Sequence, residues 1–110
     1  MSRSLPESDW KKFRQIHAAA LQRFSQQKLD HLAKLAAREG KTPQEKLLST
    51  FEFAHKTQSE MAAIFDDMRR STAFMYLLRM RAENLIAPEE WDSLSDETRK
   101  HITDLKGVLY

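Results

Sequence analysis

The sequence Ala73-Phe74-Met75-Tyr76-Leu77-Leu78-Arg79-Met80 is the most apolar stretch of the chain, with seven of its eight residues apolar or aromatic. Wound as a helix, these side chains point in every direction, and a helix that is apolar all round has to be covered by other elements. The stretch is far too short to cross a bilayer, which takes roughly 20 residues. It therefore predicts a central helix, residues 72–86, that the rest of the chain wraps.

The composition favours helices over strands. The chain has 110 residues, of which only two are glycine and three are proline, so it is poor in the residues that sheet proteins use in their turns. Its length is that of one domain with a single core. We expect a single all-α domain over residues 1–110, built as a small bundle of four to six helices around the central one.

Cysteine is absent, so neither disulfides nor thiolate metal sites are available, and the chain suits a reducing compartment. The N-terminus lacks the apolar segment of a signal peptide, and no later stretch has the length of a membrane span. The sequence predicts a cytoplasmic protein that does not enter a membrane.

Capping patterns predict where helices begin. Ser4 with Glu7, and Thr42 with Glu45, have the spacing of a capping box, and in each pair a proline lies between the two residues. Near the C-terminus, two short helices are expected, opened by Pro88 and capped by Ser95. The tail, residues 106–110, is expected to fray or to dock loosely.

Two apolar stripes follow the helical period along the long segments. The first consists of Trp10, Phe13, His17, Ala20, Leu21 and Phe24, and its helix is expected to close at Gly40. The second consists of Leu47, Leu48, Phe51, Ala54, Met61, Ala62, Phe65 and Met68. The second stripe lies about 180° from that of residues 74–85, which favours a break at residues 70–72 over one helix spanning 43–86. A kink in the first helix, near residue 16 or near residue 27, remains open.

The net charge of +2 hides blocks of alternating sign. Residues 1–41 carry +5, residues 42–68 carry −3, residues 69–86 carry +3 and residues 87–110 carry −3. Blocks of this length favour neighbouring helices of complementary charge, whereas a nucleic-acid-binding protein more often has unopposed basic surface. Nucleic-acid contact through the basic first helix is the alternative.

A charged cluster surrounds the predicted break and the central helix: Asp66, Asp67, Arg69, Arg70 and Arg81. On a helix, Asp66 would reach Arg69 and Arg70, three and four positions later, so we expect these charges to pair locally. Arg81 is expected to extend to the edge of the bundle or to pair with an acid of a neighbouring helix. Binding of a phosphate or of an acidic partner by the arginines is the alternative.

No motif specifies a chemistry. Glu52 and His55 form a single Glu-x-x-His pattern, whereas di-iron bundles use two such patterns. His17 is expected at the core edge with one ring nitrogen hydrogen-bonded. Neither a nucleophile elbow nor a phosphate loop is present, so we predict no catalytic, metal or cofactor residue. A metal-binding bundle enzyme is the third reading.

Large apolar residues are abundant for so short a chain. Phe53, Tyr76 and Met80 lie off the main stripes, and Trp91 is expected at one end of the bundle, so these four are the candidate interface residues. We therefore expect a protein–protein interaction module or a homo-oligomer, with a symmetric homodimer as the simplest form.

Three segments resemble short uncharacterised helical proteins found in bacteria: residues 5–10, 20–24 and 65–73. The resemblance extends over most of the chain. It implies a bacterial helical protein, and no named family, activity or residue role comes with it.

Overall fold

The computed structural model of the protein describes residues 4–109, which form five α-helices and no strand. These are α1 (Glu7–Ala36), α2 (Pro43–Phe65), α3 (Ala73–Ala82), α4 (Pro88–Ser93) and α5 (Asp96–Leu109). The predicted all-α fold is confirmed. Within the described part of the chain, no helix combines the length and the apolar character that a membrane crossing requires.

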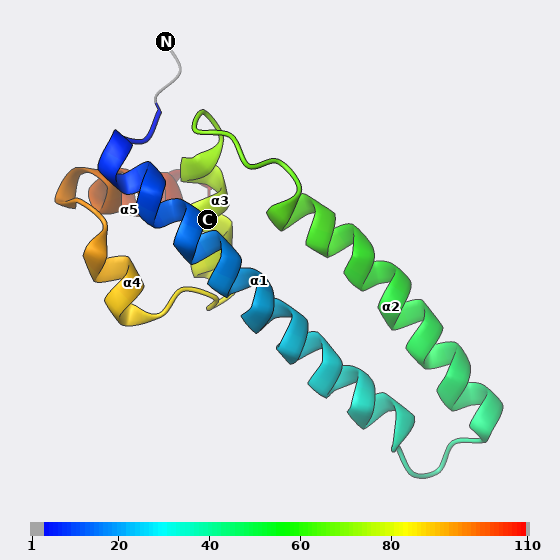
Figure 1. Ribbon diagram of the computed structural model, residues 1–110. Helices are drawn as coiled ribbons and strands as arrows, with labels where there is room; N and C mark the ends of the chain where they lie inside the picture. Colours follow the sequence, from blue (N-terminus) through cyan, green and yellow to red (C-terminus); the bar gives the residue numbers. More distant parts are fainter. Residues whose placement is uncertain (1–3, 110) are drawn as a thin grey trace.

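The helices α1 and α2 form a long antiparallel hairpin, and only one end of it is covered by α3, α4 and α5 (Figure 1). We call the uncovered part, residues 25–63, the arm, and the remainder the head. The extents of 53 × 27 × 23 Å and the radius of gyration of 16.9 Å describe an elongated molecule. A compact chain of this length would have a radius of gyration of about 13 Å.

The core lies entirely in the head. Between Phe24 and Ile64 the hairpin contains no buried residue. The buried apolar residues are Leu5, Phe13, Ile16, Ala20, Phe24, Ile64, Phe65, Ala73, Phe74, Leu77, Leu78, Met80, Leu85, Leu94 and Ile102. Half of the ten residues of α3 are among them, which confirms the central helix predicted from the apolar stretch. The helix is shorter than predicted, because the chain turns at Asn84 in the left-handed region (φ 59°).

Most predicted helix starts are confirmed. Thr42 and Glu45 form a complete capping box: the Glu45 N–H donates to Thr42 Oγ1 at 3.2 Å, and the Thr42 N–H donates to Glu45 Oε1 at 3.0 Å. The Ser95 hydroxyl accepts from the Thr98 N–H at the start of α5. The prediction for Ser4 was wrong. Pro6 is the N-cap of α1 and no side chain caps that helix, because Ser4 lies two residues too early.

The observed helix ends differ from the predicted ones. α1 runs without interruption and ends at Ala36, with Gly40 at φ +81° in the loop rather than at the cap. The break between the second and third helices is confirmed, but it covers residues 66–72 and so begins earlier than predicted. α5 continues to Leu109, so the tail is helical up to that residue, and Tyr110 lies outside the described residues.

His17 lies at the C-terminal end of α2. Its ring is buried, and Nε2 lies 3.1 Å from the backbone carbonyl oxygen of Phe65, the last residue of α2. Carbonyl groups in the last turn of a helix have no partner within the helix, so a side-chain donor at this point stabilises the end. The prediction of a core-edge histidine with one satisfied nitrogen is confirmed.

Ion pairs between neighbouring elements fit the alternating charge blocks. Arg23 of α1 makes a two-pronged contact with Glu90 of α4, at 2.5 and 3.1 Å, and also donates to the Leu85 carbonyl oxygen. Lys28 of α1 pairs with Glu60 of α2 at 3.3 Å. These contacts join segments of opposite net charge, as the sequence predicts.

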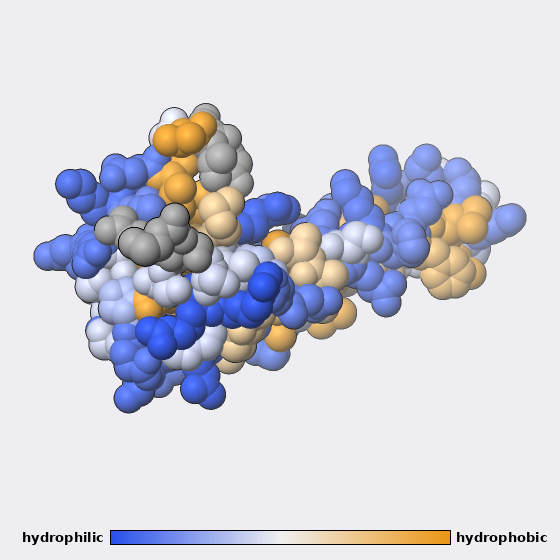
Figure 2. Space-filling model, turned by 90° about the horizontal axis from the view of Figure 1, so that it is seen from above, coloured by the Kyte–Doolittle hydropathy of each residue, from blue (hydrophilic) through white to orange (hydrophobic). Residues whose placement is uncertain are grey.

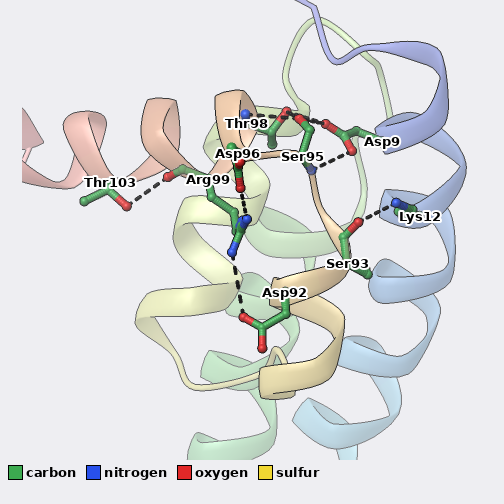
Figure 3. Close-up of polar contacts among 9 residues, drawn as sticks. All are labelled: Asp9, Lys12, Asp92, Ser93, Ser95, Asp96, Thr98, Arg99 and Thr103. Atoms are coloured by element: carbon green, nitrogen blue, oxygen red, sulfur yellow. Dashed lines mark hydrogen bonds and ion pairs between the residues drawn. The ribbon is translucent and has the colours of Figure 1, made fainter.

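Asp9 is a buried carboxylate that joins the first turn of α1 to the start of α5 (Figure 3). It accepts hydrogen bonds from the Ser95 N–H at 3.0 Å, from the Ser95 hydroxyl at 2.5 Å and from the Thr98 hydroxyl at 2.5 Å. Burial acts to raise the pKa of Asp9, but the hydrogen bonds from Ser95 and Thr98 outweigh it and lower that pKa. This contact was missed in the sequence, where Asp9 reads as an ordinary first-turn acid.

Candidate protein interface

One side of the arm is formed by apolar and uncharged residues from both helices, and we call it the neutral face. The spacing of three and four positions places its residues on one side of each helix. On α1 they are Ser25, Leu29, Leu32, Ala33 and Ala36, and on α2 they are Leu47, Phe51, Ala54, Thr57, Gln58, Met61 and Ala62. None of them carries a charge.

A shallow groove of about 270 Å³ runs between the two helices in the middle of the neutral face. Leu29, Leu32, Ala54 and Met61 contribute to its walls, and Phe53 lies between the helices. The one charged residue that lines it, Lys28, is neutralised by Glu60 and lies over the Phe24 ring, 5.1 Å from its centre. The groove therefore presents apolar surface to whatever enters it.

Large apolar side chains of the neutral face are open to solvent. Leu29 is 60% exposed, Leu47 is 54% exposed and Phe51 is 61% exposed. Figure 2 shows hydrophobic surface at intervals along the arm, which extends to the right of the view. Exposed apolar side chains gathered on one side of a small protein are typical of a contact surface for another molecule.

The opposite side of the arm has a different character. The helical positions on that side are occupied by charged residues, among them Lys34 on α1 and Glu45, Glu52 and Lys56 on α2. Leu48, half exposed, is the large apolar residue on that side. The arm is thus amphipathic across the plane of the hairpin, although neither side is covered by another element.

Five residues of the second predicted stripe lie on the neutral face: Leu47, Phe51, Ala54, Met61 and Ala62. The stripe reaches the core only at its C-terminal end, through Met61 and the buried Phe65. α2 directs Phe53, Thr57, Glu60 and Ile64 toward α1, and Leu47 and Phe51 lie on the adjacent side, where the protein places no helix. A periodic pattern shows that a helix has an apolar face. It does not show whether the same chain covers that face.

The four predicted interface residues do not form one surface. Phe53 belongs to the arm, where its ring lies 4.5 Å from that of His31. Tyr76 packs partly buried against the core, and Trp91 lies in the head. Met80 is fully buried, so its prediction as a surface residue was wrong, because this side of α3 faces the core.

The charged cluster is divided among three contacts. Arg69 pairs with Asp67 at 2.5 Å, and this hydrogen bond is the main cause that lowers the pKa of Asp67. Arg70 pairs with Glu7 at 3.0 Å and donates to the Leu5 carbonyl oxygen. Asp66 is the C-cap of α2. The predicted local pairing is confirmed for Asp67 and Arg69. It was wrong for Asp66 and Arg70, because residues 66–72 are not helical.

Arg81 lies apart from that cluster. Its guanidinium stacks on the Trp91 ring, 3.6 Å from the ring centre, in a cleft of about 440 Å³ between α3, α4 and α5. Arg81 is exposed, as the first of its two predicted placements requires, and it makes a cation–π contact in place of the alternative, a pairing with an acid. The floor of the cleft includes the buried side chains of Leu78 and Ile102.

Several cations of α1 are held by contacts within the protein. The Lys12 ammonium donates to the Ser93 carbonyl oxygen, and Arg23 and Lys28 pair with acids of α4 and α2. Lys11 and Arg14 are exposed in the part of α1 that belongs to the head. The basic first helix therefore offers less cationic surface than its sequence suggests.

The single Glu-x-x-His pattern lies on the arm, with Glu52 and His55 both exposed. Among residues 4–109, no three histidine or acidic side chains converge as ligands of a metal ion would.

Comparison of the chain with protein-family models, with curated proteins and with solved structures finds no match.

Proposed function

We propose that the protein is a protein–protein interaction module, and that the neutral face of the arm is its contact surface. The observation that carries this proposal is an uncharged apolar face on a hairpin that contains no buried residue from Ser25 to Ala63. A hairpin of this kind adds little to the core of its own domain. Its apolar surface is accounted for if another protein covers it.

Nucleic-acid contact is the weaker reading, because the neutral face carries no cation and part of the charge of α1 is held internally. Binding through the exposed Lys11 and Arg14 would fall steeply as salt rises, because phosphate contacts release counterions.

The cysteine-free composition supports a cytoplasmic setting.

The test is to purify the tagged protein from cells that make it and to quantify the proteins that accompany it, untagged copies of the chain included. The double variant Leu47→Glu, Phe51→Glu places charges on the neutral face. The control variant Glu52→Lys changes a charge on the opposite side of the same helix. Partners should be retained by the wild type and the control and lost by the double variant.

The double variant is expected to fold, because Leu47 and Phe51 are more than half exposed. Its helix content is checked by circular dichroism before the comparison. An unchanged set of partners in the folded double variant would show that the neutral face is not the contact surface.

A further inference from the structure

We propose that the cleft between α3, α4 and α5 binds a small organic anion, in which one carboxylate is carried on an apolar body such as a phenylalkyl group. This goes beyond the proposed function, because the cleft lies in the head and shares no residue with the neutral face. The proposal follows from the volume of the cleft, from its apolar floor and from two cations that line it.

The cleft has the volume and the floor of a small-molecule site. Its volume of about 440 Å³ lies within the range of about 300–1,000 Å³ that ligand pockets occupy. Leu78 and Ile102 of the floor are 2% and 1% exposed, and the partly buried Ile86 and Trp91 also line the cleft. An apolar group that enters is therefore removed from water against apolar side chains of three elements.

Two cations line the same cleft from different helices. The guanidinium of Arg81 on α3 is held against the Trp91 ring, and this stacking leaves the N–H groups at the edge of its plane to donate. Lys106 of α5 is exposed and follows Ile102 by four positions, so it lies on the same side of the helix. Within residues 4–109, neither cation forms an ion pair with an acidic side chain.

Other arginines of the protein have an acid as partner. Those that form such an ion pair are Arg23, Arg69, Arg70, Arg79 and Arg99. The guanidinium of Arg81 therefore differs from these five in having its charge available to a ligand.

The charges of the cleft favour a single negative charge on the ligand. Arg81, Lys106 and Asp92 are the charged residues among those described that line it, so the lining carries a net charge of +1. The Asp92 carboxylate lies 3.9 Å from the Arg99 guanidinium, which offsets part of its charge (Figure 3). A second negative charge on the ligand would still be repelled by Asp92.

A carboxylate fits this arrangement better than a phosphate monoester. The planar guanidinium of Arg81 can donate two parallel hydrogen bonds to a carboxylate, which is also planar. A phosphate monoester carries a charge of about −1.5 to −2 at pH 7, which exceeds the net charge of the lining. The apolar floor then accounts for the rest of the ligand.

The test is a titration of the isotope-labelled protein with phenylbutyrate, followed by the indole N–H signals in two-dimensional NMR spectra. Trp91 lines the cleft and Trp10 does not, so the two indole signals distinguish binding in the cleft from binding elsewhere. The Trp91 signal should shift and saturate with a Kd of about 0.1–1 mM, the range of a weak small ligand.

Two further compounds separate the roles of charge and apolar surface. Phenylbutyramide has the same body without the charge, and it should bind at least about fivefold more weakly because it loses the charge-assisted hydrogen bonds. Inorganic phosphate has no apolar body and should not shift the Trp91 signal.

Arg81→Gln and Lys106→Gln should each raise the Kd of phenylbutyrate at least about fivefold, because each removes one cation of the cleft. Both side chains are exposed, so both variants are expected to fold, and their NMR spectra verify this. Lys100→Gln is the matched control, since Lys100 is exposed on α5 but does not line the cleft. Its Kd should equal that of the wild type.

No saturable shift of the Trp91 signal at about 10 mM phenylbutyrate, well above the expected Kd, would overturn the site. Equal affinity for phenylbutyramide would overturn the role of the cations, and an equal response to inorganic phosphate would overturn that of the apolar floor. An equal loss in Lys100→Gln would show general attraction of anions to the surface. The double variant Leu47→Glu, Phe51→Glu should bind phenylbutyrate like the wild type, so the proposed function of the arm stands or fails separately.

Discussion

The Asp9 carboxylate accepts hydrogen bonds from both the backbone N–H and the hydroxyl of Ser95, at 3.0 and 2.5 Å, and so holds the N-cap residue of α5 against the first turn of α1. The start of α1 and the start of α5 are thereby joined within the head (Figure 3). A buried carboxylate is tolerated only where donors surround it, and here Thr98 supplies a third.

We expect Asp9→Asn to destabilise the protein by about 2 kcal/mol, because hydrogen bonds to a charged acceptor contribute about 1.5–3 kcal/mol and one buried donor would be left without its acceptor. For a domain of this size, the melting temperature should fall by roughly 10 °C. Thermal unfolding followed by circular dichroism measures the change.

Asp30→Asn is the matched control, because the Asp30 carboxylate is exposed and its contact with Gln26 lies on the surface of α1. That substitution should leave the melting temperature nearly unchanged. If the two variants had the same melting temperature, the buried contact of Asp9 would not stabilise the head.

Acid should destabilise the protein through carboxylates whose pKa is lowered in the folded state. Asp9 and Glu90 are the ones held by contacts between distant parts of the chain, whereas Glu45 and Asp67 pair with residues within three positions. For Asp9, the hydrogen bonds from Ser95 and Thr98 outweigh the effect of burial on the pKa; for Glu90, the hydrogen bond from Arg23 is the main cause of the lowered pKa. A carboxyl group with a lowered folded-state pKa stabilises the fold above its unfolded-state pKa, near 4. That contribution is lost as the pH falls through the folded-state pKa.

Urea unfolding at pH 7, 4 and 3 measures this dependence. The free energy of unfolding should change little between pH 7 and pH 5 and should fall below pH 4. The decrease should be smaller in Asp9→Asn, which has one of these groups removed. An equally steep decrease in that variant would mean that other groups cause the acid sensitivity.

The sequence is sufficient to predict where a helix begins when residues within one turn determine the start. The capping box of Thr42 and Glu45, the helix start at Pro88 and the cap at Ser95 all depend on residues within one turn of each other. The central helix is also predictable, because a stretch that is apolar on every side has no stable place at the surface. These features need no knowledge of the rest of the chain.

The candidate interface could be predicted only in part, because it depends on which faces the chain leaves uncovered. Leu47 and Phe51 have the same periodicity as residues of a buried face, and their exposure follows from the position of α3, α4 and α5 at the other end of the hairpin. The prediction that Met80 is an interface residue failed for the converse reason, since α3 is covered on the side that Met80 occupies. The missed clue was the absence of charge along one side of both arm helices.

His17→Leu should destabilise the protein by about 1–2 kcal/mol, although leucine is apolar and of similar size. The substitution leaves the Phe65 carbonyl oxygen at the end of α2 without the donor that Nε2 supplies at 3.1 Å, and an unsatisfied buried acceptor carries a cost of this order. Thermal unfolding provides the measurement.

His31→Leu is the comparison for His17→Leu, since His31 is exposed and contacts Phe53 through its ring. It should change the melting temperature by much less. A His17→Leu variant as stable as the wild type would mean that the hydrogen bond to Phe65 does not hold the end of α2.

Two phenylalanines should differ sharply in what they contribute to the stability of the single chain. Phe24 is 2% exposed and contacts the Phe65 ring edge-on at 5.5 Å, whereas Phe51 is 61% exposed on the arm. We expect Phe24→Ala to destabilise the protein by about 3–5 kcal/mol, because it removes buried surface and leaves a cavity. Phe51→Ala should change stability by less than about 0.5 kcal/mol when measured at low protein concentration, because its side chain is largely exposed. A loss of several kcal/mol at low concentration would show that Phe51 is covered within the single chain, and the neutral face would then be part of its core.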